Sequence, residues 1–330
     1  MKYYELKGYI TLTEPFYINV PNSNKFPTDT NGNPIIPASS IRGWLRFISY
    51  RSLLEVFNRK EQKFSIHEQY LLLKGTDTGG LIQSERATTI GSNFNVRKLN
   101  PHIDLYGRWG LSGSLGVGNA IAGKGALTKT PNGSRGHIAD GFDEIYDFVR
   151  NEELELLSTI MGEDGEYSKE VQDLKSRIRE LRQQTKSKEI TDQIADLEQQ
   201  INAIKAQKIG SKESVRRVNY GLSVLDAGTR LAHKMKLNSA NPQSLQFLIW
   251  TISKLRFFNL GGKANYNFGD VRALWKIYEY TFDDVVGRHV GEIGWADDDF
   301  VFELNDDLNF DLKAFQDSLT NTAFNFKDFG

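Results

Sequence analysis

Two arginines one helical turn apart, Arg42 and Arg46, are the first residues of this chain whose type and spacing suggest chemistry. They follow Ser39 and Ser40 in the stretch IPASSIRGWLR, where an apolar run meets the start of an expected helix. Either serine can cap this helix, and the remaining first-turn N–H groups favour an anion. We expect both guanidinium groups to reach outward along a phosphate chain, with Gly43 admitting close approach. The alternative is an ordinary capped helix with solvated arginines.

A glycine-rich loop, LGGKANYNFG, offers a second anion-binding pattern. Gly261 and Gly262 allow close backbone approach, and Lys263 supplies positive charge. Tyr266 and Phe268 are of the residue type on which bases stack. A plain turn with core aromatics is the competing interpretation.

Arg216 and Arg217 lie beside an aromatic residue in ESVRRVNYG. Successive side chains on a strand point to opposite faces, so at most one of the two arginines is expected to touch the same ligand. They complete the set of candidate residues for binding a phosphate chain.

Other kinds of chemistry find little support. The five histidines are widely spaced, without a partner at metal-ligand spacing, and the chain has no cysteine. GVGNAIAGKGAL lacks the Gly-Lys-Ser/Thr ending of a phosphate-binding loop. We therefore expect no catalytic residues, no metal and no cofactor.

Charge is unevenly distributed along the 330 residues. Residues 1–140 carry 17 Lys and Arg against 10 Asp and Glu, whereas residues 281–330 carry 3 against 12. A basic front and an acidic C-terminal segment, 283–330, indicate separate surfaces, one of them for a polyanion. The alternative for this segment is a solvated tail without a partner.

The elements that must position these residues follow from periodicity. Alternation over residues 4–12 predicts a half-buried strand, and the apolar spacing over 40–58 predicts a helix. Residues 214–237 are expected to form a β-hairpin turning near Ala227-Gly228. The order of strands and helices predicts an α+β fold as a single domain, 1–330.

Residues 164–209 differ in character from the rest. Apolar residues recur at spacings of three and four in two runs separated by QQTKSKE. This pattern predicts an inserted antiparallel helical hairpin, whose arms must pack on each other to be stable.

Four motifs follow one another along the chain: DTNGNPIIPASSIRGWLR, DLYGRWGLSGSLGVGNAI, KESVRRVNYGLSVLDAGTRLAHKMKL and NLGGKANYNFGDVR. Read together and in this order, they resemble the RAMP superfamily of CRISPR-associated proteins. The chain is most similar to the backbone subunit that coats guide RNA in class 1 effector complexes, in its type IV version. Asn119 stands where many relatives have Asp, and the helical hairpin is not a general family feature.

The resemblance implies a ferredoxin-like (RRM-like) palm with inserted fingers and thumb elements. It also implies a non-catalytic role in antiviral defence, in which copies form a helical filament on CRISPR guide RNA (crRNA) for pairing with target DNA or RNA. Partners would be further copies of the chain and other effector subunits. No apolar run is long enough to span a membrane, so no membrane contact is expected. MKYYELKGYI lacks a hydrophobic signal core and the chain has no cysteine, so a cytoplasmic location is expected.

Three alternatives stay open. A RAMP endoribonuclease that processes precursor guide RNA would need a general base, for which His233 is the candidate. A target-RNA-cleaving backbone subunit would need an aspartate in the loop before the IPASS helix, but residues 19–28 hold no acid, and Asp29 falls in a turn. The third is an oligomeric single-strand-binding protein unrelated to CRISPR.

Overall fold

The computed structural model describes residues 2–18, 26–82, 90–129, 133–135, 170–171, 173–178, 180–181, 188–207, 218–220, 223–239, 241–321 and 323–330. The chain divides into two compact units. Unit 1 comprises Met1–Lys129 and Ser223–Gly330, and unit 2 comprises Thr130–Leu222. Among the described helices, none is long and apolar enough to cross a membrane.

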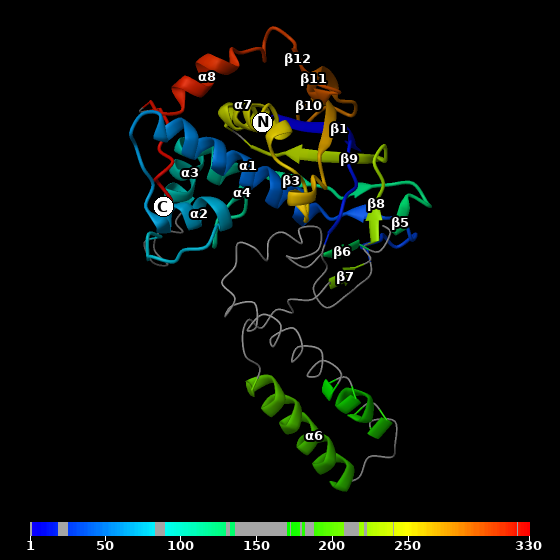
Figure 1. The fold of residues 1–330 in the computed structure, drawn as a ribbon. Coiled ribbons are helices and arrows are strands. Elements are labelled where there is room, and N and C mark those ends of the chain that lie inside the picture. The colour runs from blue at the N-terminus through cyan, green and yellow to red at the C-terminus, as the bar shows by residue number, and fades with distance from the viewer. Residues whose placement is uncertain are drawn as a thin grey trace, which may run out of the picture. The chain divides into compact units, whose positions relative to one another are not determined.

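Unit 1 is an α+β structure built on an antiparallel sheet (Figure 1). Its strands lie in the order β12–β11–β10–β1–β9–β4–β2, and β3 also pairs with β9. The strands are β1 Tyr3–Leu12, β2 Ile35–Ile36, β3 Leu115–Val117, β4 Ala120–Ile121, β9 Arg230–Leu237, β10 Val271–Tyr280, β11 Arg288–Ala296 and β12 Asp299–Leu304. The strand expected over residues 4–12 is thus confirmed, at the centre of the sheet.

Helices cover one face of this sheet and leave the other open (Figure 1). They are α1 Ala38–Asn58, α2 Ile66–Lys74, α3 Ile90–Leu99, α4 Pro101–Tyr106, α7 Pro242–Ile252 and α8 Leu312–Ser318, with the 3₁₀ turns η3 Leu255–Phe257 and η4 Ala264–Tyr266. The helix expected over 40–58 is confirmed as α1.

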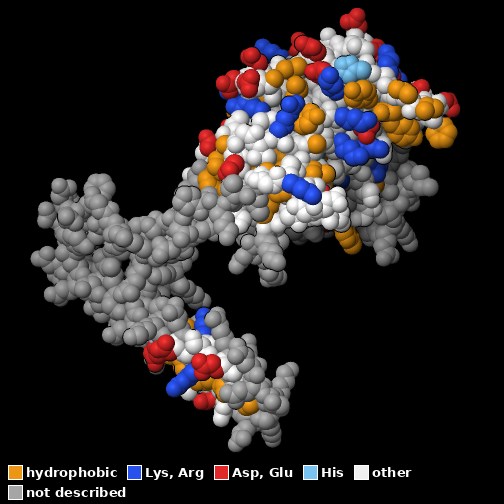
Figure 2. Space-filling model, turned by 90° about the vertical axis from the view of Figure 1, so that its right-hand side faces the viewer, with side chains coloured by type: hydrophobic (Ala, Val, Ile, Leu, Met, Phe, Trp, Pro, Cys, Tyr) orange, Lys and Arg blue, Asp and Glu red, His pale blue; other side chains and the backbone are white. Residues whose placement is uncertain are grey.

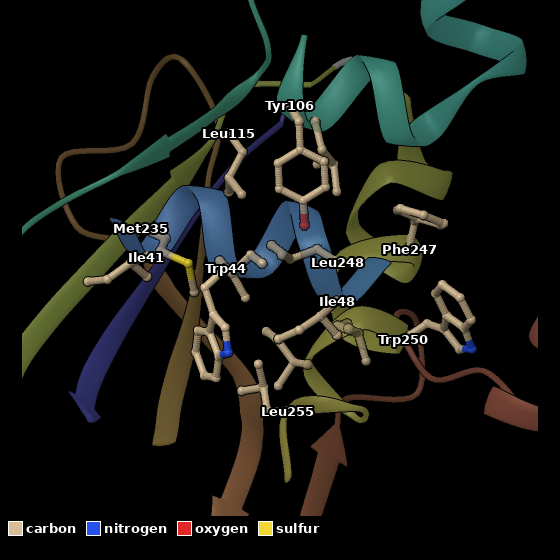
Figure 3. Close-up of a cluster of buried hydrophobic side chains, with 14 of the residues drawn as sticks. Ile41, Trp44, Ile48, Tyr106, Leu115, Met235, Phe247, Leu248, Trp250 and Leu255 are labelled. Atoms are coloured by element: carbon tan, nitrogen blue, oxygen red, sulfur yellow. The ribbon is translucent and has the colours of Figure 1, made fainter. Parts of the chain in front are cut away.

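The core lies between this helical layer and the sheet (Figure 3). Ile41, Trp44 and Ile48 project from α1 at the spacing that places them on one helix face, and all are buried. They pack with Met235 of β9 and Leu248 of α7. This packing fixes α1 beneath the sheet and leaves the opposite sheet face to solvent.

The acidic C-terminal segment is more structured than a solvated tail. It contains β11, β12 and α8, and the side chains of Phe324, Phe326 and Phe329 are buried in the core. The segment is rich in acidic residues overall, so its composition concealed its share of the core.

Two short strand pairs form outside the main sheet. β5 (Leu127–Lys129) pairs with β8 (Ser223–Leu225), and β6 (Gly133–Arg135) pairs with β7 (Val218–Tyr220). The expected β-hairpin over 214–237 is therefore wrong in its pairing. The chain does turn at Ala227-Gly228, but β8 pairs with β5 and β9 joins the main sheet.

In unit 2, the two apolar stripes of the expected helical hairpin pack on one another. α6 spans Lys188–Gln207, and residues 170–171, 173–178 and 180–181 are also helical. Leu174 and Ile178 form a buried cluster with Ile201. Residues 142–161, FDEIYDFVRNEELELLSTIM, for which the sequence predicts a helix, lie outside the described residues.

Candidate nucleic-acid interface

Arg42 and Arg46 turn inward, so the expectation that both reach outward is wrong. Arg42 donates to the carbonyl oxygens of Leu115 (2.7 Å) and Tyr106 (2.9 Å). Arg46 donates to those of Leu72 (2.6 Å) and Leu71 (2.7 Å), in the last turn of α2. Tyr106 ends α4 and Leu72 lies in the last turn of α2, where carbonyls lack intrahelical partners and attract cations, so each arginine has such an acceptor on its inner side. Burial lowers the pKa of Arg46 to about 10, which still leaves it charged at neutral pH.

The start of α1 also differs from the expectation, because neither Ser39 nor Ser40 is its N-cap. Pro37 holds that position and makes no side-chain cap. The first helical N–H, of Ala38, instead donates to the side-chain oxygen of Asn119 at 2.8 Å. Both serines lie in the first turn, and Ser39 is exposed.

Gly43 lies on the exposed side of α1, one turn beyond Ser39. A Cβ atom placed on it would meet nothing within 4 Å. Packing within the described structure therefore does not require glycine here, although glycine in a helix interior is unfavourable. Ser39, Ser40 and Gly43 stay predicted contacts.

The glycine loop uses its freedom to approach the chain itself. Gly261 has φ +90°, and a Cβ atom there would come within 2.6 Å of both the Phe16 ring and the Tyr17 carbonyl oxygen. The N–H of Gly262 donates to the same Tyr17 oxygen at 2.9 Å. Lys263 follows in a left-handed conformation, with φ 64°. We predicted that a ligand would approach the backbone of these glycines closely. In the structure, the segment that follows β1 occupies that place.

Arg216 and Arg217 lie outside the described residues, as does the side chain of Tyr266. Their proposed role stays a prediction.

The open face of the sheet brings together cations that the sequence pattern had not joined. Lys7 in β1 pairs with Lys234 in β9 and with Lys276 in β10, so three lysines form one row across three adjacent strands. Arg230 and Lys236 extend the same face of β9 on either side of this row. We call these five cations, with the tyrosines Tyr9 and Tyr278, the outer sheet face.

Aromatic rings lie between these cations. The guanidinium of Arg230 lies 3.8 Å from the ring centre of Tyr9, which is 45% exposed. The ammonium of Lys7 lies 5.3 Å from the ring centre of Tyr278. A flat surface that alternates cations with aromatic rings can hold phosphates and stack bases at once.

Carboxylates offset only part of this positive charge. Glu5 lies 2.7 Å from Lys7 and 3.9 Å from Lys236, and Glu292 of β11 lies 3.4 Å from Lys276. Within the described ranges, no carboxylate forms an ion pair with Lys234. Like charges directly opposite on neighbouring strands destabilise a sheet, so a bound anion would reduce the repulsion between these three lysines. Figure 2 turns the sheet side of unit 1 to the viewer and shows Lys and Arg side chains gathered there.

Sequence reasoning missed the outer sheet face, although a signal existed. YYELKGYITL holds one cation, Lys7, and cations recur two or four positions apart in RLAHKMKL and VRALWKIYEY. Each segment alone reads as a half-buried strand. Only the register β9–β1–β10 places the three sets of cations side by side.

His233, the candidate base of the endoribonuclease alternative, lies under the sheet. It is 4% exposed, and its Nδ1 accepts from Trp275 Nε1 at 3.1 Å across Gly8, which has no side chain to separate them. Burial lowers the pKa of His233 to about 4. His233 therefore does not face a nucleic acid bound on the outer sheet face.

Asp29, the acid nearest the loop considered for target-RNA cleavage, stabilises its own turn. Its carboxylate accepts hydrogen bonds from the N–H groups of Asn31 and Asn33.

In the described part of the chain, no three His, Cys, Asp or Glu side chains group as they would around a metal ion. No family model matches this chain, and no curated protein does.

Proposed function

We propose that this chain is a non-catalytic RNA-binding subunit that lines up in several copies along a guide RNA in the cytoplasm. The observation that carries this proposal is the outer sheet face, where Lys7, Lys234 and Lys276 form a row beside the exposed Tyr9 and the half-buried Tyr278. The motif resemblance supports the guide role and the pairing of the guide with a target DNA or RNA.

The strand order supports a ferredoxin-like (RRM-like) palm. β1 is followed by α1, then by β3 and β4, and β9 is followed by α7 and β10. In the sheet, β10, β1, β9 and β3 lie side by side and antiparallel, as expected for a β-α-β-β-α-β unit. Folds of this kind bind single-stranded RNA on the open face of the sheet, where aromatic rings stack bases.

The proposed contacts do not read sequence. Lysine ammonium groups would neutralise phosphates as flexible point charges, and Tyr9 and Tyr278 would stack bases of any identity. Base pairing between guide and target then supplies the specificity.

The proposal is tested by the salt dependence of binding to a single-stranded RNA of about ten nucleotides, too short to template several copies. Lys7, Lys234 and Lys276 are changed to Ala together. If each lysine contacts one phosphate, the slope of log K against log salt falls by about 2 in magnitude. The matched control changes Lys60, Lys74 and Lys98, exposed lysines on the helical side, to Ala and leaves the slope unchanged. Equal slopes for both variants would contradict the proposal.

The guide role has its own test, which is the sequence of RNA that purifies with the protein. RNA of uniform length with a repeat-derived end supports a CRISPR guide. RNA of mixed length and sequence would instead support the non-CRISPR single-strand-binding alternative, since the outer sheet face does not discriminate between the two.

A further inference from the structure

The turn between β10 and β11, residues 281–287, exposes apolar side chains to an unusual degree. Phe282 is 85% exposed, Val285 95% and Val286 81%. A hydrogen bond within the turn defines its conformation: the carboxylate of Asp284 accepts from the N–H of Thr281 at 2.5 Å. We call residues 281–287 the β10–β11 tip. An apolar cluster held in solvent by a defined turn is typical of a contact surface.

A groove of matching character lies elsewhere in unit 1. It has a volume of about 490 Å³ and lies between α7, η3, β11, β12 and α8. Its apolar lining includes Trp250, Trp295, Phe300 and Leu312, and Phe257 is 68% exposed. We call it the α7–α8 groove.

Charge makes the tip and the groove complementary. The tip carries Asp283 and Asp284 beside its apolar residues, whereas Lys254, Arg256 and Lys313 line the groove. None of the ten described lining residues is acidic. Arg256 lies 4.9 Å from the ring centre of Trp295. Burial, with the nearby charge of Arg59, lowers the pKa of Lys254, so an arriving carboxylate would stabilise its charged form.

A copy of the chain cannot fill its own groove with its own tip. The tip joins β11 at Arg288, while the groove contacts the same strand at Trp295. Seven residues of extended strand separate the two by roughly 23 Å. A contact between unlike surfaces at opposite ends of a strand can join copies only head to tail, which generates rings or filaments.

We propose that the β10–β11 tip of one copy docks in the α7–α8 groove of the next. Phe282, Val285 and Val286 enter the apolar floor, and Asp283 meets the basic rim. This inference rests on the proposed filament role and deepens it by naming the two surfaces that join neighbouring copies.

The test uses the RNA-free full chain, so that its result is independent of RNA binding. The tip variant carries Phe282→Ser, Val285→Ser and Val286→Ser; the groove variant carries Arg256→Glu and Lys313→Glu, both exposed positions. In sedimentation velocity, the wild-type chain grows beyond dimers with concentration, and each variant alone has its association weakened at least tenfold. Each variant retains one intact surface, so an equal mixture forms heterodimers and stops there.

A charge exchange tests the rim independently of the apolar residues. Asp283→Lys weakens association with the wild-type groove and restores it, in part, with the groove variant. Thermal unfolding checks that every variant is folded.

Three outcomes would overturn the inference: a wild-type chain that stays monomeric, a mixture that forms no heterodimer, or a groove variant that associates normally but loses short-RNA binding. The last would make the groove a nucleic-acid surface. Unchanged short-RNA binding after Lys7, Lys234 and Lys276 are changed to Ala, with association intact, would instead contradict only the proposed function.

Discussion

Arg46 is a structural cation in this protein, and its environment leads to a prediction about stability. Its guanidinium holds the carbonyl oxygens of Leu71 and Leu72 at the end of α2. Arg46→Ala leaves these acceptors without their charged donor and opens a gap beside Gly75, so the free energy of unfolding should fall by about 2–4 kcal/mol. Chemical denaturation measures this change.

Arg51→Ala is the matched control, because Arg51 lies on α1 but is exposed. We expect it to change stability by less than about 0.5 kcal/mol. Equal losses for the two variants would contradict the structural role of Arg46. Short-RNA binding by folded Arg46→Ala protein should keep the wild-type salt slope.

His233 gives unit 1 a pH dependence of defined sign. Its pKa is about 4 when folded, against an ordinary value of 6.5, because burial disfavours the imidazolium. Between these values the unfolded chain binds a proton that the folded chain does not. The contribution of His233 to the free energy of unfolding is therefore fully present above pH 6.5. It falls by roughly 3 kcal/mol in all as the pH falls toward 4.

His233→Asn checks this prediction, because the asparagine oxygen can still accept from Trp275 but does not titrate. The free energy of unfolding should fall less steeply between pH 6.5 and 4 than in the wild-type chain. His102, which is buried with a strongly lowered pKa, retains a contribution of the same sign. Identical pH profiles would refute the assignment to His233.

At the scale of elements, α1 shows how far the sequence could lead. Its apolar spacing predicted the helix and its buried face, because burial repeats every three to four residues. The direction of Arg42 and Arg46 could not be predicted, since it depends on where α2 and α4 end in space. The same holds for the outer sheet face, which exists only through the register of β9, β1 and β10.

The exposed side of α1 carries a prediction about Gly43. Because a Cβ atom there meets nothing, Gly43→Ala should raise the free energy of unfolding by about 0.5–1 kcal/mol. Binding of short RNA should be unchanged, because the proposed phosphate contacts lie on the sheet. Destabilisation would reveal a backbone constraint at this position. A stabilised variant with weakened binding would place RNA along α1, as the motif first suggested.

At the scale of the molecule, the division into two units predicts that the helical hairpin is dispensable for folding. Leu174, Ile178 and Ile201 bury one another rather than the core of unit 1. Replacement of residues 166–207 by a short Gly/Ser linker should change the unfolding free energy of unit 1 by less than about 1 kcal/mol. Loss of cooperative unfolding would show that the hairpin belongs to the central core.

The central claim is that single-stranded RNA lies on the outer sheet face of unit 1, and ultraviolet crosslinking tests it most directly. A uridine-rich RNA of about ten nucleotides is crosslinked to the full chain, and the modified residues are mapped by mass spectrometry. The account predicts crosslinks at Tyr9 and Tyr278, lost when Lys7, Lys234 and Lys276 are changed to Ala. Crosslinks confined to residues 38–47, to 259–268 or to the helical hairpin would contradict it.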